Sequence, residues 1–292
     1  MTEEPAGEAR PAVVLVGTPI GNLGDISVRA VEALTQADVI AAEDTRRTRP
    51  MLTALGIPAG GRLVSFHGPH EAELAAKLVA RIVERGERLV CVTDAGMPAI
   101  SDPGERLVTA ALAAGVAVEV VPGPSAALAG LVVSGLPTAR FVFEGFLPRK
   151  GRQRAARLAE LKAEERTAVL FEAPHRLEAT LADLAEALGA DRPVAVAREI
   201  TKRFETVWRG TLGQAVSGEG PQARGEQVIV LGGAVPAENS APDDEAIEHA
   251  LRSELDAGAT TRDAAAAVAN RLGVTRRRAY AIANTLRGPA RS

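Results

Sequence analysis

Aromatic residues and cysteine are scarce in this sequence of 292 residues, and both absences limit what the protein can be. Phe, Trp and Tyr make up 3% of the chain, so we expect cores built from Ala, Val, Leu and Ile. The single cysteine, Cys91, lies within an apolar run and is predicted to be a small core residue. One cysteine excludes both a disulfide framework and a cysteine metal cluster.

Long apolar runs and an excess of positive charge are missing too. No stretch of about 18 apolar residues could span a bilayer and no signal-peptide pattern is present, so we expect a cytoplasmic protein without a membrane partner. The net charge of −3 argues by itself against a polyanionic partner. However, basic residues concentrate within 149–166 and again after residue 264, where no acidic residue occurs. These clusters predict contacts with phosphate groups, although solvated helix faces would give the same pattern.

The pattern of apolar residues divides the chain into three parts. Residues 12–136 alternate between short apolar runs and amphipathic segments, which predicts a parallel, doubly wound α/β sheet. Residues 137–233 contain strand-like runs with fewer helices between them, and we expect a second α/β domain with a mixed sheet there. After a linker, residues 244–288 are predicted to form a helical extension. Its turn at Gly273 resembles a helix-turn-helix, and simple packing without nucleic acid is the alternative.

The most informative segment is 91–104, in which a buried strand ends at Thr93 and Asp94 and a loop of Gly, Pro, Ala and Ser follows. In open α/β sheets, ligands bind outside the carboxyl ends of the strands. Small residues at such a position let backbone groups face a ligand directly. We therefore predict a small-molecule site beside Asp94.

Glycine-rich turns follow two other predicted strands. The spacing of Gly17, Gly21 and Gly24 does not fit the dinucleotide fingerprint, and the chain has no P-loop. We expect this turn to hold a ligand at the same sheet edge, with a plain tight turn as the alternative, and Asp25 to cap the next helix. The segment 122–126 begins another helix, whose free N–H groups could hold an anion or a ring nitrogen.

Acidic and basic residues are adjacent directly after the strand predicted at 39–42. Glu43 and Asp44 are candidate general bases, and Arg46 and Arg47 suit a substrate that offers phosphate and hydroxyl groups together. Capping of a helix by Asp44 is the structural alternative.

His67 follows a further strand and is the third candidate for proton transfer. It has only His70 nearby as a second imidazole and no clear third ligand, so no metal site is predicted. Mixed acidic and basic clusters at 172–176 and 198–202 follow strands of the second domain, which predicts a cleft between the domains.

Together these blocks resemble the tetrapyrrole methylase superfamily over roughly 13–232. The resemblance implies two α/β domains with S-adenosylmethionine in the cleft, and a homodimer. The blocks that carry it are residues 17–26, 42–46, 93–104, 122–126, 143–148, 171–176 and 197–202. The cofactor contacts that it implies are Ile20, Asp94, Met97, Ser125, Ala126, Phe171 and Ala197.

Within the superfamily, the blocks are most similar to those of methyltransferases that act on the 2′-hydroxyl of a cytidine in small-subunit (16S) ribosomal RNA. This similarity implies rRNA or the small ribosomal subunit as the partner. One alternative is a methylase of a tetrapyrrole intermediate, and another is a nucleic-acid-binding regulator without enzymatic activity. The residues expected to contact RNA are Arg46, Arg47, Lys150, Arg152 and Arg277.

Overall fold

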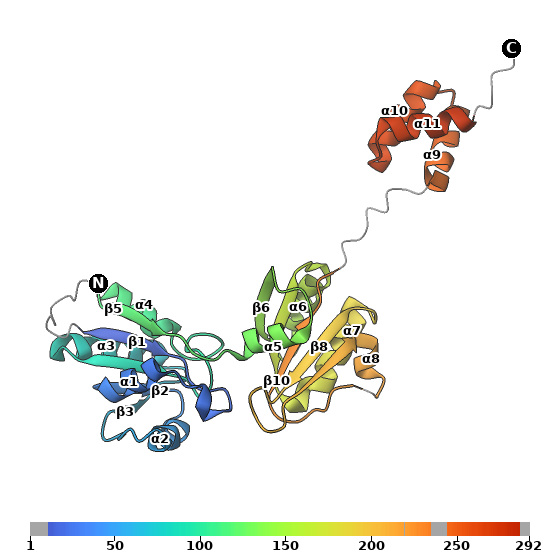
Figure 1. The fold of residues 1–292 in the computed structure, drawn as a ribbon. Coiled ribbons are helices and arrows are strands. Elements are labelled where there is room, and N and C mark those ends of the chain that lie inside the picture. The colour runs from blue at the N-terminus through green and yellow to red at the C-terminus, as the bar shows by residue number, and fades with distance from the viewer. Residues whose placement is uncertain (1–10, 219, 235–243, 287–292) are drawn as a thin grey trace, which may run out of the picture. The chain divides into compact units, whose positions relative to one another are not determined.

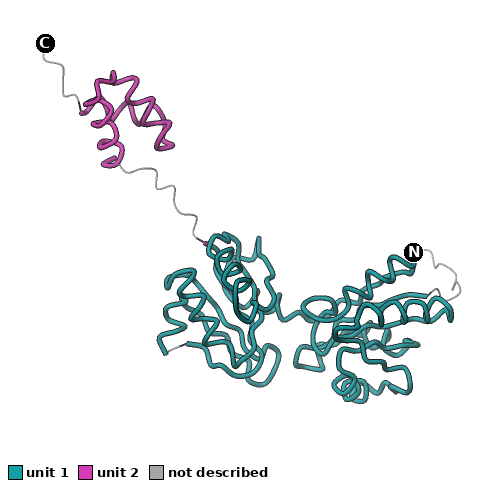
Figure 2. The backbone as a smooth tube through the Cα atoms, turned by 180° about the vertical axis from the view of Figure 1, so that it is seen from behind, with its two compact units in different colours: residues 1–233 teal, residues 234–292 magenta. Residues whose placement is uncertain are grey.

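The computed structural model describes residues 11–218, 220–234 and 244–286. The chain divides into two compact units, residues 1–233 and 234–292 (Figure 2). Within the described residues, no helix is long and apolar enough to cross a membrane.

The first unit begins with a five-stranded parallel sheet in the order β3-β2-β4-β1-β5 (Figure 1). This confirms the predicted doubly wound arrangement, because alternate strand residues enter two separate cores. Val13 and Leu89 pack with α3 and α4, whereas Val14 and Val90 pack with α1 and α2. The strands are β1 (Ala12–Val16), β2 (Val39–Ala42), β3 (Leu63–Ser65), β4 (Arg88–Val92) and β5 (Ala117–Val121). The helices are α1 (Val28–Gln36), α2 (Thr45–Ala54), α3 (Glu71–Arg85) and α4 (Glu105–Ala113).

A second five-stranded sheet in the same unit has the order β6-β7-β10-β8-β9. It is mixed, as predicted, because β6 and β7 are parallel and the other neighbours are antiparallel. Helix α5 covers one face, and α6, α7 and α8 cover the other. The strands are β6 (Phe141–Phe146), β7 (Thr167–Glu172), β8 (Pro193–Arg198), β9 (Thr206–Thr211) and β10 (Gln227–Leu231). The helices are α5 (Ala126–Ser134), α6 (Gly151–Ala163), α7 (Leu177–Leu188) and α8 (Leu212–Val216).

The described residues of the second unit form a bundle of three helices, α9 (Asp244–Asp256), α10 (Thr261–Leu272) and α11 (Arg276–Leu286). Gly273 ends α10 in the left-handed conformation, with φ of 66°, as its position in the sequence predicts. Residues 287 and 288 of the predicted helical extension lie outside the described residues.

One predicted helix start is wrong. Asp25 belongs to a short 3-10 turn, η1 (Leu23–Asp25), and does not cap α1. The cap is Ser27, whose Oγ accepts a hydrogen bond from Ala30 N at 3.1 Å. Both residue types favour the cap position, and the intervening 3-10 turn moves the helix start onwards.

The loops after β1 and β5 approach each other backbone to backbone. A Cβ atom on Gly17 would lie 2.6 Å from the Gly123 Cα atom, and Gly17 N donates to Val121 O at 3.0 Å. No larger residue fits at either glycine without moving a loop, so this contact requires glycine on both sides.

We expect Gly17→Ala to lower the free energy of unfolding by about 1–3 kcal/mol, because the added methyl group overlaps backbone that cannot rotate away. Urea unfolding followed by the fluorescence of Trp208, the single tryptophan, measures this in the first unit. Gly61→Ala is the matched control, since a Cβ there meets nothing within 4 Å. Equal midpoints for the two variants would contradict the proposed close approach.

Candidate functional site

A cavity of about 400 Å³ opens at the carboxyl ends of the strands of the first sheet. Glu43 after β2 and Asp94 after β4 line it from this sheet, whereas Phe146 of β6 and Phe171 of β7 line it from the second sheet. This is the sheet edge at which the sequence predicts a ligand, and its position follows the general rule for open α/β sheets.

The loop after Asp94 is held in a strained conformation. Ala99 and Ser101 have φ of 69° and 65°, a region that costs a residue with a side chain roughly 1–2 kcal/mol. Thr18 fixes the start of the loop, because its backbone exchanges hydrogen bonds with Gly96 at 2.9 and 3.1 Å. Its hydroxyl also donates to Thr93 O at 3.1 Å. Backbone strain of this kind is common at binding sites.

Three carboxyl groups converge beside this loop. The Thr93 hydroxyl lies 2.6 Å from Glu43 Oε2 and 2.8 Å from Asp102 Oδ2, and Asp94 N donates to Glu43 Oε2 at 3.1 Å. Burial raises the pKa of Asp102 to about 6, and the charges of Glu43 and Asp94 add to the rise against the lowering effect of the Thr93 hydrogen bond. Burial also raises the pKa of Asp94, with Glu43 adding to the effect and Arg47 opposing it.

The three predicted proton-transfer residues lie in different environments. Glu43 lines the cavity. Asp44 is not among the lining residues, and it caps α2 by accepting from Arg46 N at 2.8 Å. The hydrogen bonds from Arg46 lower the pKa of Asp44 to about 2. His67 is exposed after β3 and also lies outside the set of lining residues.

Most of the expected cofactor contacts meet at the cavity. Ala197 is the exception, because it is buried in β8 within the core that α5 forms with the second sheet. Within the described residues, no group of three or more His, Cys, Asp or Glu side chains is placed to hold a metal ion. The expected contacts that line the cavity are Ile20, Asp94, Met97, Ser125, Ala126 and Phe171.

Comparison with known proteins identifies the family. The model of the Tetrapyrrole (Corrin/Porphyrin) Methylases matches residues 12–216. The chain belongs to this family. It is 44% identical over 267 residues to "Ribosomal RNA small subunit methyltransferase I" of Synechocystis, covering 91% of this chain and 95% of that protein. It is 49% identical over 224 residues to the Mycobacterium tuberculosis protein of the same name, covering 77% of this chain and 78% of that protein.

A solved structure of a tetrapyrrole methylase has the same fold. Uroporphyrin-III-C-methyltransferase from Thermus thermophilus superposes with a TM-score of 0.55 at 25% identity, covering 76% of this chain and 94% of that one. A second structure of that enzyme, in complex with S-adenosylhomocysteine, has a TM-score of 0.53 at 24% identity, covering 76% and 97%.

The basic residues expected to contact RNA do not form one group. Arg47 lines the cavity and lies 3.4 Å from Asp94, measured from Nε to Oδ2. The side chain of Arg46 is exposed and pairs with Asp44 at 2.8 Å. Lys150 and Arg152 are exposed at the start of α6. Arg277 is also exposed, but it belongs to the separate second unit.

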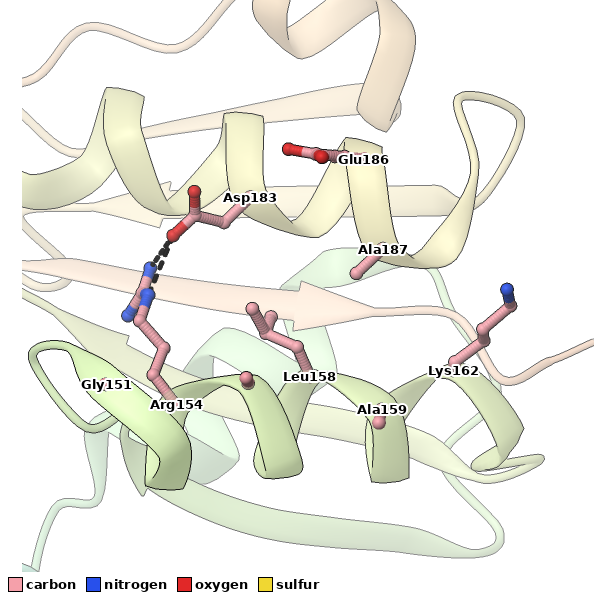
Figure 3. Close-up of a pocket in the computed structure, with 9 residues that line it drawn as sticks. Gly151, Arg154, Leu158, Ala159, Lys162, Asp183, Glu186 and Ala187 are labelled. Atoms are coloured by element: carbon pink, nitrogen blue, oxygen red, sulfur yellow. Dashed lines mark hydrogen bonds and ion pairs between the residues drawn. The ribbon is translucent and has the colours of Figure 1, made fainter.

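One member of the basic segment 149–166 has a structural role that the sequence does not indicate. Arg154 is only 9% exposed, and its Nε donates to Asp183 Oδ2 at 2.7 Å across the groove between α6 and α7 (Figure 3). It also donates to Pro148 O at 3.0 Å and to Thr180 Oγ1 at 3.1 Å. These contacts leave Arg154 unable to bind phosphate, so its inclusion in the predicted phosphate-binding cluster is corrected.

The Arg154 contacts continue to the wall of the cavity. The Thr180 hydroxyl donates to Glu172 Oε2 at 2.6 Å, and Glu172 is a buried residue that lines the cavity. The sequence does not indicate this connection, because Arg154 lies in α6 and Thr180 lies in α7, 26 residues further along the chain. The only signal is that a basic residue lies at an inward position of a helix.

We expect Arg154→Ala to lower the free energy of unfolding by about 2 kcal/mol, since it leaves the Thr180 and Pro148 oxygens without their donor. The exposed neighbour Arg152→Ala should change it by less than about 0.5 kcal/mol. Urea unfolding followed by Trp208 fluorescence compares the two. Equal losses, or none for Arg154→Ala, would contradict the structural role.

Proposed function

We propose that this protein transfers a methyl group from S-adenosylmethionine to the 2′-hydroxyl of a cytidine in 16S ribosomal RNA. The observation that carries the proposal is that two relatives, 44% and 49% identical, share a name that specifies the small ribosomal subunit. In this reading residues 12–136 and 137–233 are the two domains that complete the cleft, and the helical extension is an accessory element. Its proposed site of action is the cytoplasm, where its substrate is made.

The cavity fits the proposed methyl donor. Its volume of about 400 Å³ lies within the usual range for small-ligand sites, and Gly96 leaves backbone open to it. When bound, S-adenosylmethionine supplies a methyl group on a positively charged sulfur, and the carboxylates of Glu43 and Asp94 favour that charge. Apolar parts of the ligand would contact Ile20, Ala95, Met97, Phe171 and Val228.

Proton transfer is assigned to Glu43 in preference to Asp44 and His67. A ribose hydroxyl is a weak nucleophile, so a general base is expected to contribute about 10²–10⁴-fold to the rate. Among the three candidates, only Glu43 lines the cavity. Its Oε2 is oriented by Thr93 and by the Asp94 N–H. Such fixed geometry is what an in-line displacement needs from the protein.

RNA contacts are proposed for Arg47 at the cavity, for three further exposed basic residues and for Arg277 of the second unit. Arg46, Arg47, Lys150 and Arg152 would hold the phosphates that flank the target nucleotide. Phe146 lines the cavity with 53% of its surface exposed, and its ring centroid lies 5.7 Å from that of Phe171. A half-exposed aromatic side chain at this position could stack on the target base.

The decisive experiment supplies labelled S-adenosylmethionine with unmodified small ribosomal subunits, naked 16S rRNA, or a uroporphyrinogen. We expect label on a cytidine ribose of the rRNA, and a loss of at least a hundredfold in single-turnover rate for Glu43→Gln. Glu119→Gln, a partly exposed carboxylate outside the cavity, is the matched control. Label on the tetrapyrrole alone would establish the alternative activity of the family. Binding of the methyl donor without any transfer would favour a regulator.

A homodimer is also proposed, and the surface of α5 supports it. This helix has the sequence Ala-Ala-Leu-Ala-Gly-Leu-Val-Val-Ser, apolar on every side, as is typical of a helix buried all round. Ala127 and Leu131 pack on the second sheet. Leu128 and Val132, one turn apart, are 51% and 73% exposed. A second copy of the chain would cover this outer face.

We expect the wild-type protein to have the mass of a dimer in light scattering, and Val132→Asp to have that of a monomer, because a charge cannot be buried unpaired in an apolar interface. Val28→Asp on α1, which is equally exposed, should leave the mass unchanged. A monomeric wild type would reject the dimer without affecting the proposed chemistry.

A further inference from the structure

The Thr93 hydroxyl has one hydrogen atom but lies within hydrogen-bonding distance of two carboxyl groups. The distances are 2.6 Å to Glu43 Oε2 and 2.8 Å to Asp102 Oδ2, and Thr93 is only 2% exposed. A hydroxyl donates a single hydrogen bond, so the two short contacts are both hydrogen bonds only when one of the carboxyl groups carries a proton. We call these three groups the Thr93 bridge. When both carboxyl groups are ionised, the Thr93 bridge has one hydrogen atom for two contacts, so one of the contacts is not a hydrogen bond.

No basic side chain in the described part of the chain supplies the missing hydrogen atom. Within the described residues, neither Glu43 nor Asp102 has an ion pair, because Arg47 pairs with Asp94. The carboxylate of Glu71 accepts from Gly104 N, two residues after Asp102, at 3.0 Å. The other charged groups that line the same cavity are Arg47 of α2, Asp94 after β4, and Glu172 and Glu226 at the second sheet.

We propose that Glu43, Thr93 and Asp102 form a single proton-accepting unit, in which Asp102 is a positioning residue that acts on Glu43 through the Thr93 hydroxyl. The proposal rests on the proposed methyl transfer and specifies how the ribose proton is taken up. It accounts for the partial burial of Asp102, which forms no ion pair with any of the described residues.

Proton uptake completes the hydrogen bonding of the bridge. As the ribose oxygen bonds to the methyl carbon, the S–C bond of the donor breaks and its electron pair stays on sulfur. The hydroxyl proton moves to Glu43 Oε2. Glu43 then donates to Thr93 Oγ1, and Thr93 turns its own hydrogen towards Asp102. The ionised bridge is therefore the active form, and a bridge that already holds the extra proton is inactive.

The pH dependence of single-turnover methylation of small ribosomal subunits, at saturating S-adenosylmethionine, tests this. Since burial raises the pKa of Asp102 to about 6, we expect the wild-type rate to rise with pH through that value. In Asp102→Asn the amide donates to Thr93 at every pH. The rise near pH 6 should therefore disappear, and the rate at pH 8 should fall at least tenfold. An unchanged profile in Asp102→Asn would overturn the proposal.

Two substitutions at Thr93 distinguish the effect of its hydroxyl group from the effect of the shape of its side chain. Thr93→Val keeps the shape and removes the bridging hydrogen, so we expect the rise near pH 6 to be lost. Thr93→Ser keeps the hydroxyl and should restore the rise. Equal profiles for the Val and Ser variants would also overturn the proposal.

A second measurement tests the protonation of the Thr93 bridge without ligand and without enzymatic activity. A carboxyl group whose pKa is higher in the folded than in the unfolded state takes up a proton on folding, so it destabilises the fold as the pH rises between the two values. We expect the urea midpoint of Asp102→Asn, relative to wild type, to increase from pH 5 to pH 7.5, while Glu119→Gln shows no such trend. A constant difference would count against a proton held at the bridge.

These experiments separate the two proposals. A wild-type protein that methylates no RNA contradicts the proposed function, and the urea series still tests the protonation of the bridge. A wild type that methylates RNA with the same pH profile as Asp102→Asn contradicts the bridge alone.

Discussion

The packing of α5 against the second sheet is the contact on which the cavity depends. A Cβ atom on Gly130 would lie 2.6 Å from Val228 Cγ1, so helix and strand are as close as glycine allows. The helix follows β5 of the first sheet directly, and it buries Leu131 against residues of the second. Its N-cap is Ser125, whose Oγ accepts from Leu128 N at 3.4 Å. One short apolar helix thus joins both sheets and places its own first turn at the cavity.

Acidic and basic side chains lie in different environments at this cavity. The carboxyl groups of Glu43, Asp94 and Asp102 lie inside, where burial raises the pKa of the two aspartates. The arginines are mostly exposed or engaged with acidic partners, as Arg46 is with Asp44. An acidic interior suits the cationic sulfur of the proposed methyl donor. The net charge of the whole chain does not reveal this separation, because its acidic and basic residues are nearly equal in number.

Features encoded by neighbouring residues were predictable from the sequence, whereas those set by distant contacts were not. The parallel sheet was predictable because each apolar run ends in Gly, Pro or a polar pair at the same edge. Asp94 could be placed at the site for the same reason. Asp102 could not be connected with Glu43, because the two carboxyl groups come from different loops and are linked only through the Thr93 hydroxyl. The burial of Arg154 depends on Asp183 in the next helix. The position of Ala197 behind the cavity depends on the register of β8 against β10.

The strand order of the first sheet has a consequence for synthesis on the ribosome. The first strand made, β1, lies between β4 and β5, and Val16 pairs with Val121. The most apolar strand of the nascent chain therefore stays without either neighbour while the intervening helices and loops are translated, on the order of ten seconds at about 5–20 residues per second. Until then β1 is an exposed template for incorrect pairing with other chains. The early folding of this protein therefore depends on the delay between the synthesis of β1 and that of its neighbours β4 and β5.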